Sequence, residues 1–352
     1  MSSDTQTLSR PCSQACLSTD TKRLRGQFFT TTNPFNLDPF HKWFKSIPCF
    51  NEAILLEPFA GANNIVGMIM DLGYKNSWSC YDIEPVNSDD NATGIPVAQR
   101  DTLSDYPQGF HIAITNPPYL AKNSATRRGM PFPDTKHDDL YKLSLEVMLA
   151  ETPYVAAIIP ESFITQGMFH SRLHAVISLT CKMFEDTEVP VCLALFVPES
   201  EKEDRLNFSV YSENRLLGTY SSLVSHLTRF EGKGIPWKFN DSKGQIGLYA
   251  IDSQKCASIK FLEGERVPEA DVKESSRSVT RISADLPPEM VSKVINEANK
   301  ILSTRREATK DTFMTAFKGL RQDGRYRRRL DFAQAREILN LAAQNAGVLR
   351  ND

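Results

Sequence analysis

The sequence of 352 residues lacks several features that would place it outside ordinary globular proteins. None of its seven cysteines belongs to a Cys-x-x-Cys pair and their number is odd, which disfavours a zinc site and a secreted disulfide framework. No stretch reaches about 18 consecutive apolar residues, and the N-terminus lacks the apolar region of a signal peptide. Glycine (17 residues) and proline (20 residues) are too few for a collagen-like or low-complexity chain. We therefore expect a folded cytoplasmic protein without a metal site or a membrane span.

A strong net charge is also absent, since 41 Lys and Arg face 43 Asp and Glu for a formal charge of -2. This balance disfavours a small histone-like protein that holds nucleic acid by bulk electrostatics. The charge is nevertheless segregated, because residues 26–200 contain 11 basic and 20 acidic residues whereas residues 201–352 contain 26 and 21. An acidic middle part and a basic C-terminal part indicate two regions with different partners.

Length and periodicity predict an α/β protein with two domains, at about 150 residues per domain. Residues 1–24 are rich in Ser and Thr without a hydrophobic period, so we expect a disordered tail. In residues 25–200, short apolar runs alternate with helical patterns, which predicts a mostly parallel sheet with helices on both faces. The expected strands are 53–56, 77–81, 111–115, 154–159 and 191–197, and the expected helices are 65–72, 139–149 and 170–177.

A different pattern follows a charged linker at residues 198–205. Pro287 and Pro288 open a helix, and Asp331 is a candidate N-cap for a last helix that reaches Gly347. We therefore predict a second, α+β domain with a helical C-terminus over residues 205–352. Its expected β-like segments are 207–211, 245–251, 257–262 and 278–282.

Small residues follow the first predicted strand, in the segment Glu57-Pro-Phe-Ala-Gly61. Such a turn lets the backbone approach a ligand, and an acidic group beside it accepts hydrogen bonds from the ligand's amine or hydroxyls. Asp82 ends the next strand, where a carboxylate typically bonds the two hydroxyls of a ribose. The two features together indicate an adenosine-type ligand, with a plain strand–helix connection as the alternative.

The segment Asn116-Pro-Pro-Tyr119 follows another apolar strand. Two consecutive prolines fix φ and provide no N–H donor, so the carbonyls of Asn116 and Pro117 can point outward as rigid acceptors. An acceptor side chain beside a fixed carbonyl suits a substrate amino group with two N–H bonds to donate. The exocyclic nitrogen of adenine fits, because two acceptors draw it toward tetrahedral geometry. Tyr119 adds an aromatic face, and the alternative is a rigid loop without a chemical role.

With these motifs in this order, residues 26–198 resemble the catalytic domain of S-adenosylmethionine-dependent DNA methyltransferases that methylate amino groups. The resemblance implies a Rossmann-like class I methyltransferase sheet followed by a target-recognition region. Asn at position 116, rather than Ser or Asp, favours adenine N6 over cytosine N4. Asn63 stands where the family usually has a second glycine in the cofactor loop, and asparagine tolerates the left-handed conformation better than most residues.

Short segments spread over the catalytic domain carry the resemblance, and each implies a role for its residues. They are 26–30, 57–61, 81–85 and 101–103 for the cofactor, 116–119 for catalysis, 154–164 for the strand and loop that follow, and 183–184 for a second aromatic ring beside the base. The implied cofactor-binding residues are Phe28, Phe29, Thr30, Glu57, Pro58, Phe59, Ala60, Gly61, Asp82, Ile83, Asp101, Thr102, Leu103 and Asn116. The implied catalytic residues are Asn116, Pro117, Pro118, Tyr119 and Phe184.

Basic residues outside the motifs predict contact with nucleic acid. The long polar loop between Leu120 and Asp139 contains several cations, and we expect it to close over DNA. Residues 277–336 include 14 basic and 7 acidic residues, and arginines bond phosphates and guanine edges. A solvated insertion and a solvated charged face are the alternatives. The candidate DNA-binding residues are Lys122, Arg127, Arg128, Arg277, Arg281, Arg305, Arg306, Arg325, Arg327, Arg328 and Arg329.

The sequence therefore predicts a site-specific DNA adenine-N6 methyltransferase that flips its target base and transfers the methyl group by direct in-line displacement. The expected cofactor is S-adenosylmethionine and the expected partner is double-stranded DNA, with a monomer favoured. The recognition sequence and a functional partnership with a restriction endonuclease stay open. A protein glutamine methyltransferase of the release-factor-modifying kind also uses Asn-Pro-Pro-Tyr, but its helical substrate domain precedes the catalytic one. The same residues are compatible with an RNA adenine methyltransferase and, less well, with a non-catalytic DNA-binding module.

Overall fold

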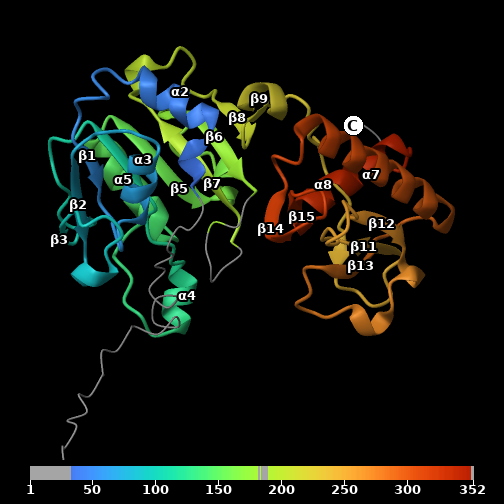
Figure 1. The fold of residues 1–352 in the computed structure, drawn as a ribbon. Helices are drawn as coiled ribbons and strands as arrows, with labels where there is room; N and C mark the ends of the chain where they lie inside the picture. Colours follow the sequence, from blue (N-terminus) through green and yellow to red (C-terminus); the bar gives the residue numbers. More distant parts are fainter. Residues whose placement is uncertain (1–32, 181–182, 184–188, 350–352) are drawn as a thin grey trace, which may run out of the picture.

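A nine-stranded sheet with the order β3-β2-β1-β4-β5-β7-β6-β8-β9 forms the first part of the chain (Figure 1). The structure, a computed structural model, describes residues 33–180, 183 and 189–349, so the predicted tail at 1–24 lies outside the described residues. The strands from β3 to β5 are parallel, β7 runs antiparallel between β5 and β6, and β8 and β9 extend the sheet beyond β6. Their bounds are Leu55–Glu57 (β1), Trp78–Asp82 (β2), Val97–Gln99 (β3), Ile112–Thr115 (β4), Tyr154–Pro160 (β5), Leu173–Leu179 (β6), Val191–Phe196 (β7), Ser209–Ser212 (β8) and Arg215–Thr219 (β9).

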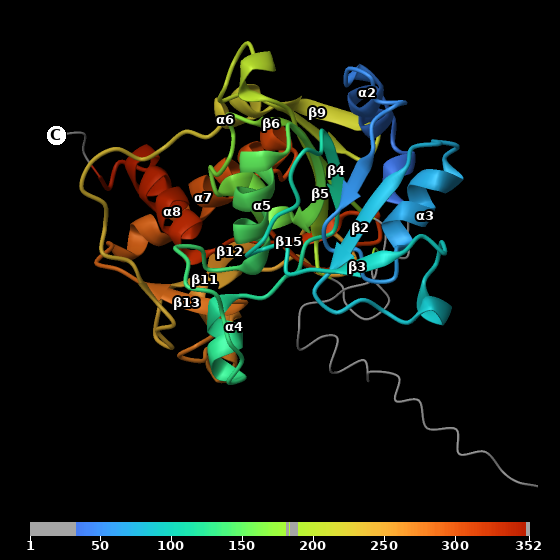
Figure 2. The same ribbon diagram turned by 90° about the vertical axis from the view of Figure 1, so that its left-hand side faces the viewer.

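Helices cover both faces of this sheet (Figures 1 and 2). Helices α2 (Asp38–Ser46) and α3 (Asn64–Asp71) pack on one face and α5 (Leu140–Glu151) packs on the other. Successive side chains of a strand point to opposite faces, and β5 follows this rule. Its Tyr154, Ala156 and Ile158 join the cluster under α2 and α3, whereas Val155, Ala157 and Ile159 join the cluster under α5.

The predicted α/β fold class, a mostly parallel sheet between two layers of helices, is confirmed. One predicted element is wrong, because residues 170–177 do not form a helix and β6 begins at Leu173. Six of the seven residues of β6 are buried. A strand buried on both faces reads as a continuous apolar run, which periodicity does not distinguish from a buried helix. The β-branched pair Val176 and Ile177 was the local signal for a strand.

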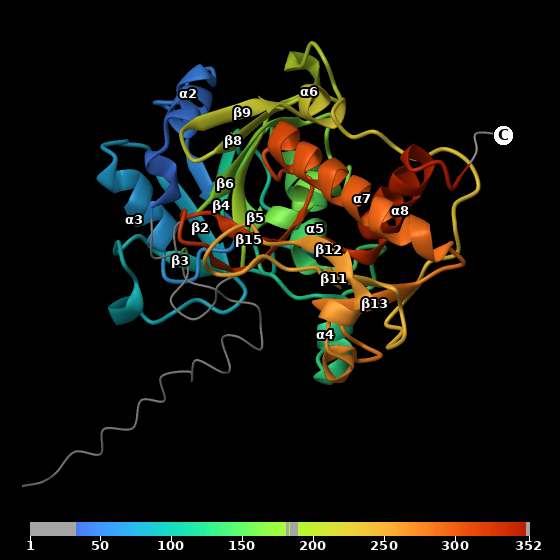
Figure 3. The same cartoon turned by 90° about the vertical axis from the view of Figure 1, so that its right-hand side faces the viewer.

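The C-terminal region has an antiparallel sheet of the order β10-β13-β11-β12, a hairpin and two long helices that lie side by side (Figure 3). Apolar residues of β11, α7 and α8 form one hydrophobic cluster between these elements. Asp331 caps α8 as predicted, since its side chain accepts a hydrogen bond from the backbone N–H of Gln334 (2.9 Å). The bounds are Lys238–Phe239 (β10), Ile246–Tyr249 (β11), Lys260–Glu263 (β12), Val279–Ser283 (β13), Pro288–Thr309 (α7), Thr315–Leu320 (β14), Tyr326–Arg329 (β15) and Phe332–Asn345 (α8).

The first sheet extends beyond residue 200, where the sequence placed the end of the first domain. The segment 207–211, predicted as part of the C-terminal domain, contributes to β8, which pairs with β6. The short helix α6 (Tyr220–Val224) follows β9 and packs Leu223 into the cluster under α5. We therefore propose that the boundary between the two regions follows α6. The remaining short helices are Pro34–Asn36 (η1), Ser88–Asp90 (η2), Lys122–Arg127 (α4), Glu161–Thr165 (η3), Glu199–Glu201 (η4), Gly264–Arg266 (η5) and Glu269–Asp271 (η6).

Within the residues that the structure describes, no helix combines the length and the apolar composition needed to cross a bilayer.

Candidate active site

Three residues predicted to carry the chemistry lie at the carboxyl ends of neighbouring parallel strands. Glu57 ends β1, Asp82 ends β2 and Asn116 directly follows β4. Because β1 lies between β2 and β4, the three residues share one edge of the sheet. Ligands of open α/β sheets bind outside this edge. The fold thus brings two of the predicted cofactor segments, 57–61 and 81–85, and the predicted catalytic segment to one place.

Glu57 is a buried carboxyl group with one unsatisfied oxygen. Its Oε1 accepts hydrogen bonds from the hydroxyl of Thr115 and from the backbone N–H of Phe59 (3.0 Å). Its Oε2 is buried and has no partner among the described residues. Burial raises the pKa of Glu57 to about 8, although the hydrogen bonds from Thr115 and Phe59 oppose the shift. Because Oε2 has no partner among the described residues, it is open to a ligand, and an ammonium group beside it would favour the ionised carboxylate.

Backbone N–H groups hold both carboxylate oxygens of Asp82. Oδ2 accepts from the N–H of Gly61 (2.9 Å) and Oδ1 from the N–H of Glu84 (2.8 Å). Burial raises the pKa of Asp82, and the N–H of Gly61 opposes the shift. Each oxygen keeps a lone pair for a further donor. The neighbouring Ile83 is 59% exposed, so an apolar surface lies beside the carboxylate, which suits a nucleoside.

The loop after β1 takes the conformation that its sequence predicts. Asn63 has the left-handed backbone conformation expected for it, with φ at 60°. Its side chain is buried and donates to the carbonyl of Ile95 (2.8 Å), so it stays inside the fold. The backbone N–H of Ala60 donates to the carbonyl of Tyr81 (2.8 Å), which joins the loop to the end of β2. Asn63 therefore supports the left-handed turn at the position where a second glycine was expected.

The segment 101–103 lies beside the same loop. The hydroxyl of Thr102 donates to the carbonyl of Pro58 (2.9 Å) and is buried. Asp101 is exposed, and its Oδ1 accepts from the N–H of Leu103 (3.2 Å). This arrangement brings a third predicted cofactor segment next to Glu57 and leaves the other oxygen of Asp101 available to a donor.

Asn116 and Tyr119 form a local hydrogen-bonded unit. The hydroxyl of Tyr119 lies 2.6 Å from Oδ1 of Asn116 and 2.6 Å from the carbonyl oxygen of Ile158 on β5. Its ring packs against both hydrophobic clusters and meets Tyr141 edge-on, with ring centroids 6.3 Å apart. Pro117 and Pro118 lie between the two residues and supply no N–H donor. The segment is therefore a rigid turn that carries acceptors, and a stacking role for Tyr119 stays a proposal.

Four residues of the predicted site, Phe28, Phe29, Thr30 and Phe184, lie outside the described residues.

Comparisons with known proteins find similarity among solved structures. No protein-family model matches the sequence, and no curated protein does. Similar structures include the type I restriction-modification methyltransferase subunit from Streptococcus thermophilus (TM-score 0.38, 15% identity, covering 58% of this chain and 49% of that one). A second is a putative class I S-adenosylmethionine-dependent methyltransferase from Listeria monocytogenes (TM-score 0.36, 15% identity, covering 52% of this chain and 68% of that one). A third is a modification subunit of a putative type I restriction enzyme from Vibrio vulnificus (TM-score 0.33, 13% identity, covering 53% of this chain and 47% of that one).

The chain matches parts of these three solved structures at 13–15% sequence identity. It spans about half the length of the Streptococcus subunit. The activity proposed below therefore rests on the chain's own residues.

Four arginines predicted to contact DNA have partners inside the protein. Arg281, Arg305, Arg306 and Arg328 have side chains only 10–12% exposed. Arg281 contacts Val267, Ser242 and Glu269, and Arg305 contacts Thr228 and Glu337. Arg306 pairs with Asp252 and Asp311, and Arg328 pairs with Glu161. Since these guanidinium groups are engaged inside the protein, they are less available to phosphates than the exposed cations, and a DNA contact by them stays a prediction.

The other predicted cations lie nearer the surface. Lys122, Arg127 and Arg128 are exposed on and just after α4, and the bridge between Ala121 and Asp139 closes the base of their loop. The loop predicted to close over DNA thus contains a short helix, and its two ends are joined by this bridge.

In the C-terminal region, Arg277 and Arg325 are exposed and Arg329 is half-buried. Arg277 and Arg329 line a surface pocket of about 440 Å³, together with Asn240 and the start of α8. Arg327 is held by the carbonyl of Asp252 (2.7 Å), with its guanidinium over a phenylalanine ring. Since Glu274 and Asp331 line the same pocket, a phosphate contact by Arg277 and Arg329 stays a prediction.

Two residues of the site escaped the sequence-based prediction. Thr115 is the last residue of β4, and its hydroxyl bonds the carboxyl group of Glu57. Glu161 directly follows β5, is buried, and accepts from Ser178 and Arg328. Both lie at the end of an apolar strand, and this position could have identified them from the sequence as candidate site residues.

Proposed function

We propose that this chain is an S-adenosylmethionine-dependent DNA methyltransferase that modifies N6 of adenine. The observation that carries the proposal is the juxtaposition of Asn116-Pro-Pro-Tyr119 at the end of β4 with Glu57 and Asp82 at the ends of β1 and β2. One half of this edge offers acceptors for an amino group, and the other half offers carboxyl groups for an adenosine-type cofactor.

The residues at the strand ends fit S-adenosylmethionine. The unpartnered Oε2 of Glu57 suits the ammonium group or a hydroxyl, and the carboxylate of Asp82, fixed by two N–H groups, suits the ribose. Ile83 and Asp101 flank these carboxyl groups, and Asp101 is the residue proposed for the adenine amino group. When bound, the cofactor supplies an electrophilic methyl group on a sulfonium sulfur. The chain's own task is to hold the substrate nitrogen in line with that group.

Asn116 Oδ1 and the carbonyl of Pro117 are the proposed acceptors for the two N6 hydrogens of adenine. Hydrogen bonds to two acceptors pull the amino nitrogen out of conjugation and orient its lone pair, so no strongly basic side chain is required. The base must first leave the helix, which costs a few kcal/mol. Stacking on an aromatic ring returns about 1–3 kcal/mol per base, and Tyr119 and Phe184 are the proposed rings.

Exposed cations support duplex DNA as the substrate. Lys122 and Arg127 lie on α4, and Arg277 lies just before β13. The α4 helix and β13 lie toward the same end of the molecule, and α2 lies at the opposite end (Figures 1 and 2). A duplex laid along this end would meet cations of both regions, and phosphate contacts of this kind provide most of the sequence-independent affinity.

A substrate competition with labelled S-adenosylmethionine tests the proposal. The purified chain is given unmethylated genomic DNA, an RNA mixture and a glutamine-containing peptide, and the products are separated by liquid chromatography and mass spectrometry. The expected product is N6-methyldeoxyadenosine in the DNA. Label only in the RNA or the peptide would replace the proposal by one of those methyltransferase activities. DNA binding without transfer of label to any substrate would indicate a non-catalytic DNA-binding module.

A further inference from the structure

Arg328 reaches from the C-terminal hairpin into the first sheet. It belongs to β15, and its Nη1 donates to Oε1 of Glu161 at 3.0 Å. Glu161 directly follows β5, and its Oε1 also accepts from the hydroxyl of Ser178 on β6 at 2.9 Å. The side chains of Arg328 and Glu161 are only 10% and 2% exposed. A buried ion pair therefore joins the two regions of the chain.

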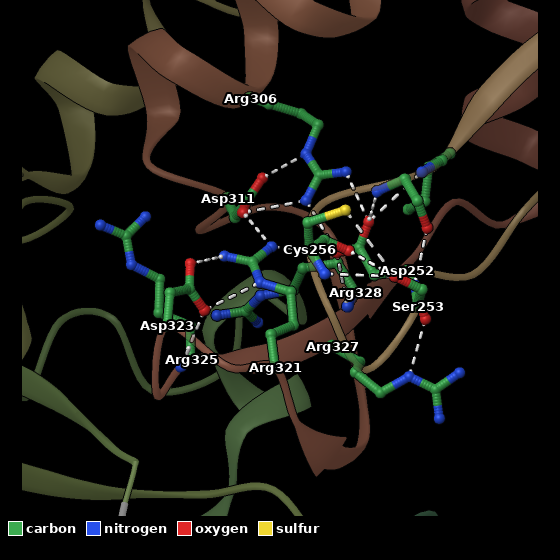
Figure 4. A network of polar contacts seen from close by, with 12 residues as sticks. Asp252, Ser253, Cys256, Arg306, Asp311, Arg321, Asp323, Arg325, Arg327 and Arg328 are labelled. Atoms are coloured by element: carbon green, nitrogen blue, oxygen red, sulfur yellow. Dashed lines mark hydrogen bonds and ion pairs between the residues drawn. The ribbon is translucent and has the colours of Figure 1, made fainter.

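The backbone of Arg328 is held in place by Asp252 (Figure 4). The N–H of Asp252 donates to the carbonyl of Arg328 (2.9 Å), and Oδ2 of Asp252 accepts from the N–H of Arg328 (3.1 Å). The carboxylate of Asp252 is fully buried and is paired with Arg306 through two hydrogen bonds of 2.8 Å and with Arg321 at 3.1 Å. A carboxylate bonded from several sides fixes the strand from which Arg328 projects.

Two pockets lie where elements of the two regions meet. A pocket of about 350 Å³ is lined by Tyr220 and Leu227 from one side and by Leu302 and Phe313 from the other. A smaller pocket of about 40 Å³ adjoins Arg328. Both pockets leave part of this contact unfilled by side chains. Since loose apolar contacts define orientation poorly, a directional buried pair is suited to define how the regions sit together.

The ion pair attaches close to the proposed catalytic segment. Glu161 lies three residues after Ile158, whose carbonyl oxygen is 2.6 Å from the hydroxyl of Tyr119. Without Arg328, the buried carboxylate of Glu161 would keep Ser178 as its one side-chain donor among the described residues. Leaving a buried charge unpaired is strongly unfavourable, so the contact between the regions would have to rearrange to admit water.

We propose that Arg328 is a positioning residue that fixes the C-terminal region against the carboxyl edge of the first sheet and so aligns bound DNA with Asn116. The choice of DNA as the aligned substrate rests on the proposed function, whereas the fixing of the two regions does not. A guanidinium that the sequence assigns to phosphate contact thus acts between the regions instead.

The test replaces Arg328 by methionine, which keeps most of the side-chain length and removes the charge. Calorimetric unfolding is expected to change from one transition to two, because the regions no longer unfold together. The kcat for DNA methylation is expected to fall at least about ten-fold, with the KM for S-adenosylmethionine and the Kd for DNA within about two-fold of the wild type. If the substitution only impairs folding, the fraction of active protein falls and calorimetry shows no second unfolding transition.

Matched variants complete the experiment. Arg328→Lys keeps the charge and is expected to restore a single transition and most of kcat. Lys318→Met removes an exposed charge from β14 of the same hairpin and is expected to behave as the wild type. If Arg328→Met does not fold, Glu161→Gln, which keeps an acceptor for Arg328 and Ser178, takes its place with a smaller effect in the same direction.

One transition with unchanged kcat in Arg328→Met, or in Glu161→Gln if that variant replaces it, would overturn the proposal. A wild type that methylates no substrate contradicts the proposed function alone, because the calorimetric comparison still decides whether Arg328 fixes the two regions.

Discussion

The hydroxyl of Tyr119 lies 2.6 Å from Oδ1 of Asn116, the oxygen proposed to accept a hydrogen of the substrate amino group. An amide oxygen has two lone pairs, so it can accept from the hydroxyl and from the substrate together. The same hydroxyl is 2.6 Å from the carbonyl oxygen of Ile158, so its one proton is shared between an acceptor on the catalytic segment and an acceptor on β5. Tyr119 therefore holds the Asn116 amide in addition to any stacking by its ring.

Tyr119→Phe separates these two contributions, because it removes the hydroxyl and keeps the ring. We expect kcat to fall about five-fold, the kinetic equivalent of one lost hydrogen bond of about 1 kcal/mol, with little change in the KM for DNA. Tyr119→Ala also removes the ring and should raise the KM for DNA. Steady-state methylation of a duplex measures both values. An unchanged kcat in Tyr119→Phe would refute the positioning role of the hydroxyl.

Cofactor binding should release a proton from Glu57 near neutral pH. Burial raises the pKa of this carboxyl group to about 8, so it is mostly protonated at pH 7 without a ligand. A positively charged cofactor beside it favours the ionised form and lowers the pKa. Titration calorimetry in buffers of different ionisation enthalpy should detect proton release at pH 7 in the wild type and much less in Glu57→Gln. Equal heats in all buffers for the wild type would exclude Glu57 as the contact.

Arg277 and Arg329 should each contribute one phosphate contact. The logarithm of the DNA association constant falls with the logarithm of the salt concentration, with a slope of about 0.9 per phosphate neutralised. The double variant Arg277→Ala/Arg329→Ala is expected to bind more weakly and to reduce the slope by about 2. Lys42→Ala, on α2 at the other end of the molecule, is the control and should leave both values unchanged. A wild-type slope in the double variant would remove these two residues from the interface.

The Asp252 network should stabilise the protein above about pH 4. Burial alone would raise the pKa of Asp252, but hydrogen bonds and the charge of Arg306 lower it to about 2. A carboxyl group with a lowered folded-state pKa stabilises the fold above its unfolded pKa, and this contribution is lost as the pH falls through the folded pKa. Asp252→Asn should cost about 2 kcal/mol at pH 7 and less at pH 3. Urea unfolding at both pH values provides the comparison, and an equal cost at both would contradict the ionised assignment.

Strand periodicity located the central residues of the candidate site, whereas segments such as 101–103 were assigned from the family resemblance. Glu57, Asp82 and Asn116 each end or follow an apolar run, and parallel strands bring such positions to one edge. The backbone of Asn63 and the cap at Asp331 were also predictable, since both depend on residues close in the sequence. These features are local, so a single sequence was sufficient to predict them.

The functions of the arginines depend on distant partners and were not predictable in the same way. Arg306 pairs with Asp252, which is 54 residues away, and Arg328 with Glu161, which is 167 residues away. A cluster of arginines on a phosphate-binding face and a cluster buried in ion pairs look alike in sequence. The same reason applies to the first sheet, because only strand pairing reveals that it extends beyond residue 200 to β8.

Methylation of adenine N6 should depend entirely on Asn116, whose amide oxygen is the proposed acceptor at the reacting nitrogen. The decisive measurement is a map of modified bases in DNA from cells that express the wild-type chain or Asn116→Ala, in a host without adenine methylation of its own. We expect N6-methyladenine at a fixed sequence motif in the first sample and none in the second, with S-adenosylmethionine binding retained by the variant. Absence of N6-methyladenine from the wild-type sample, or equal methylation in both samples, would contradict the proposed function.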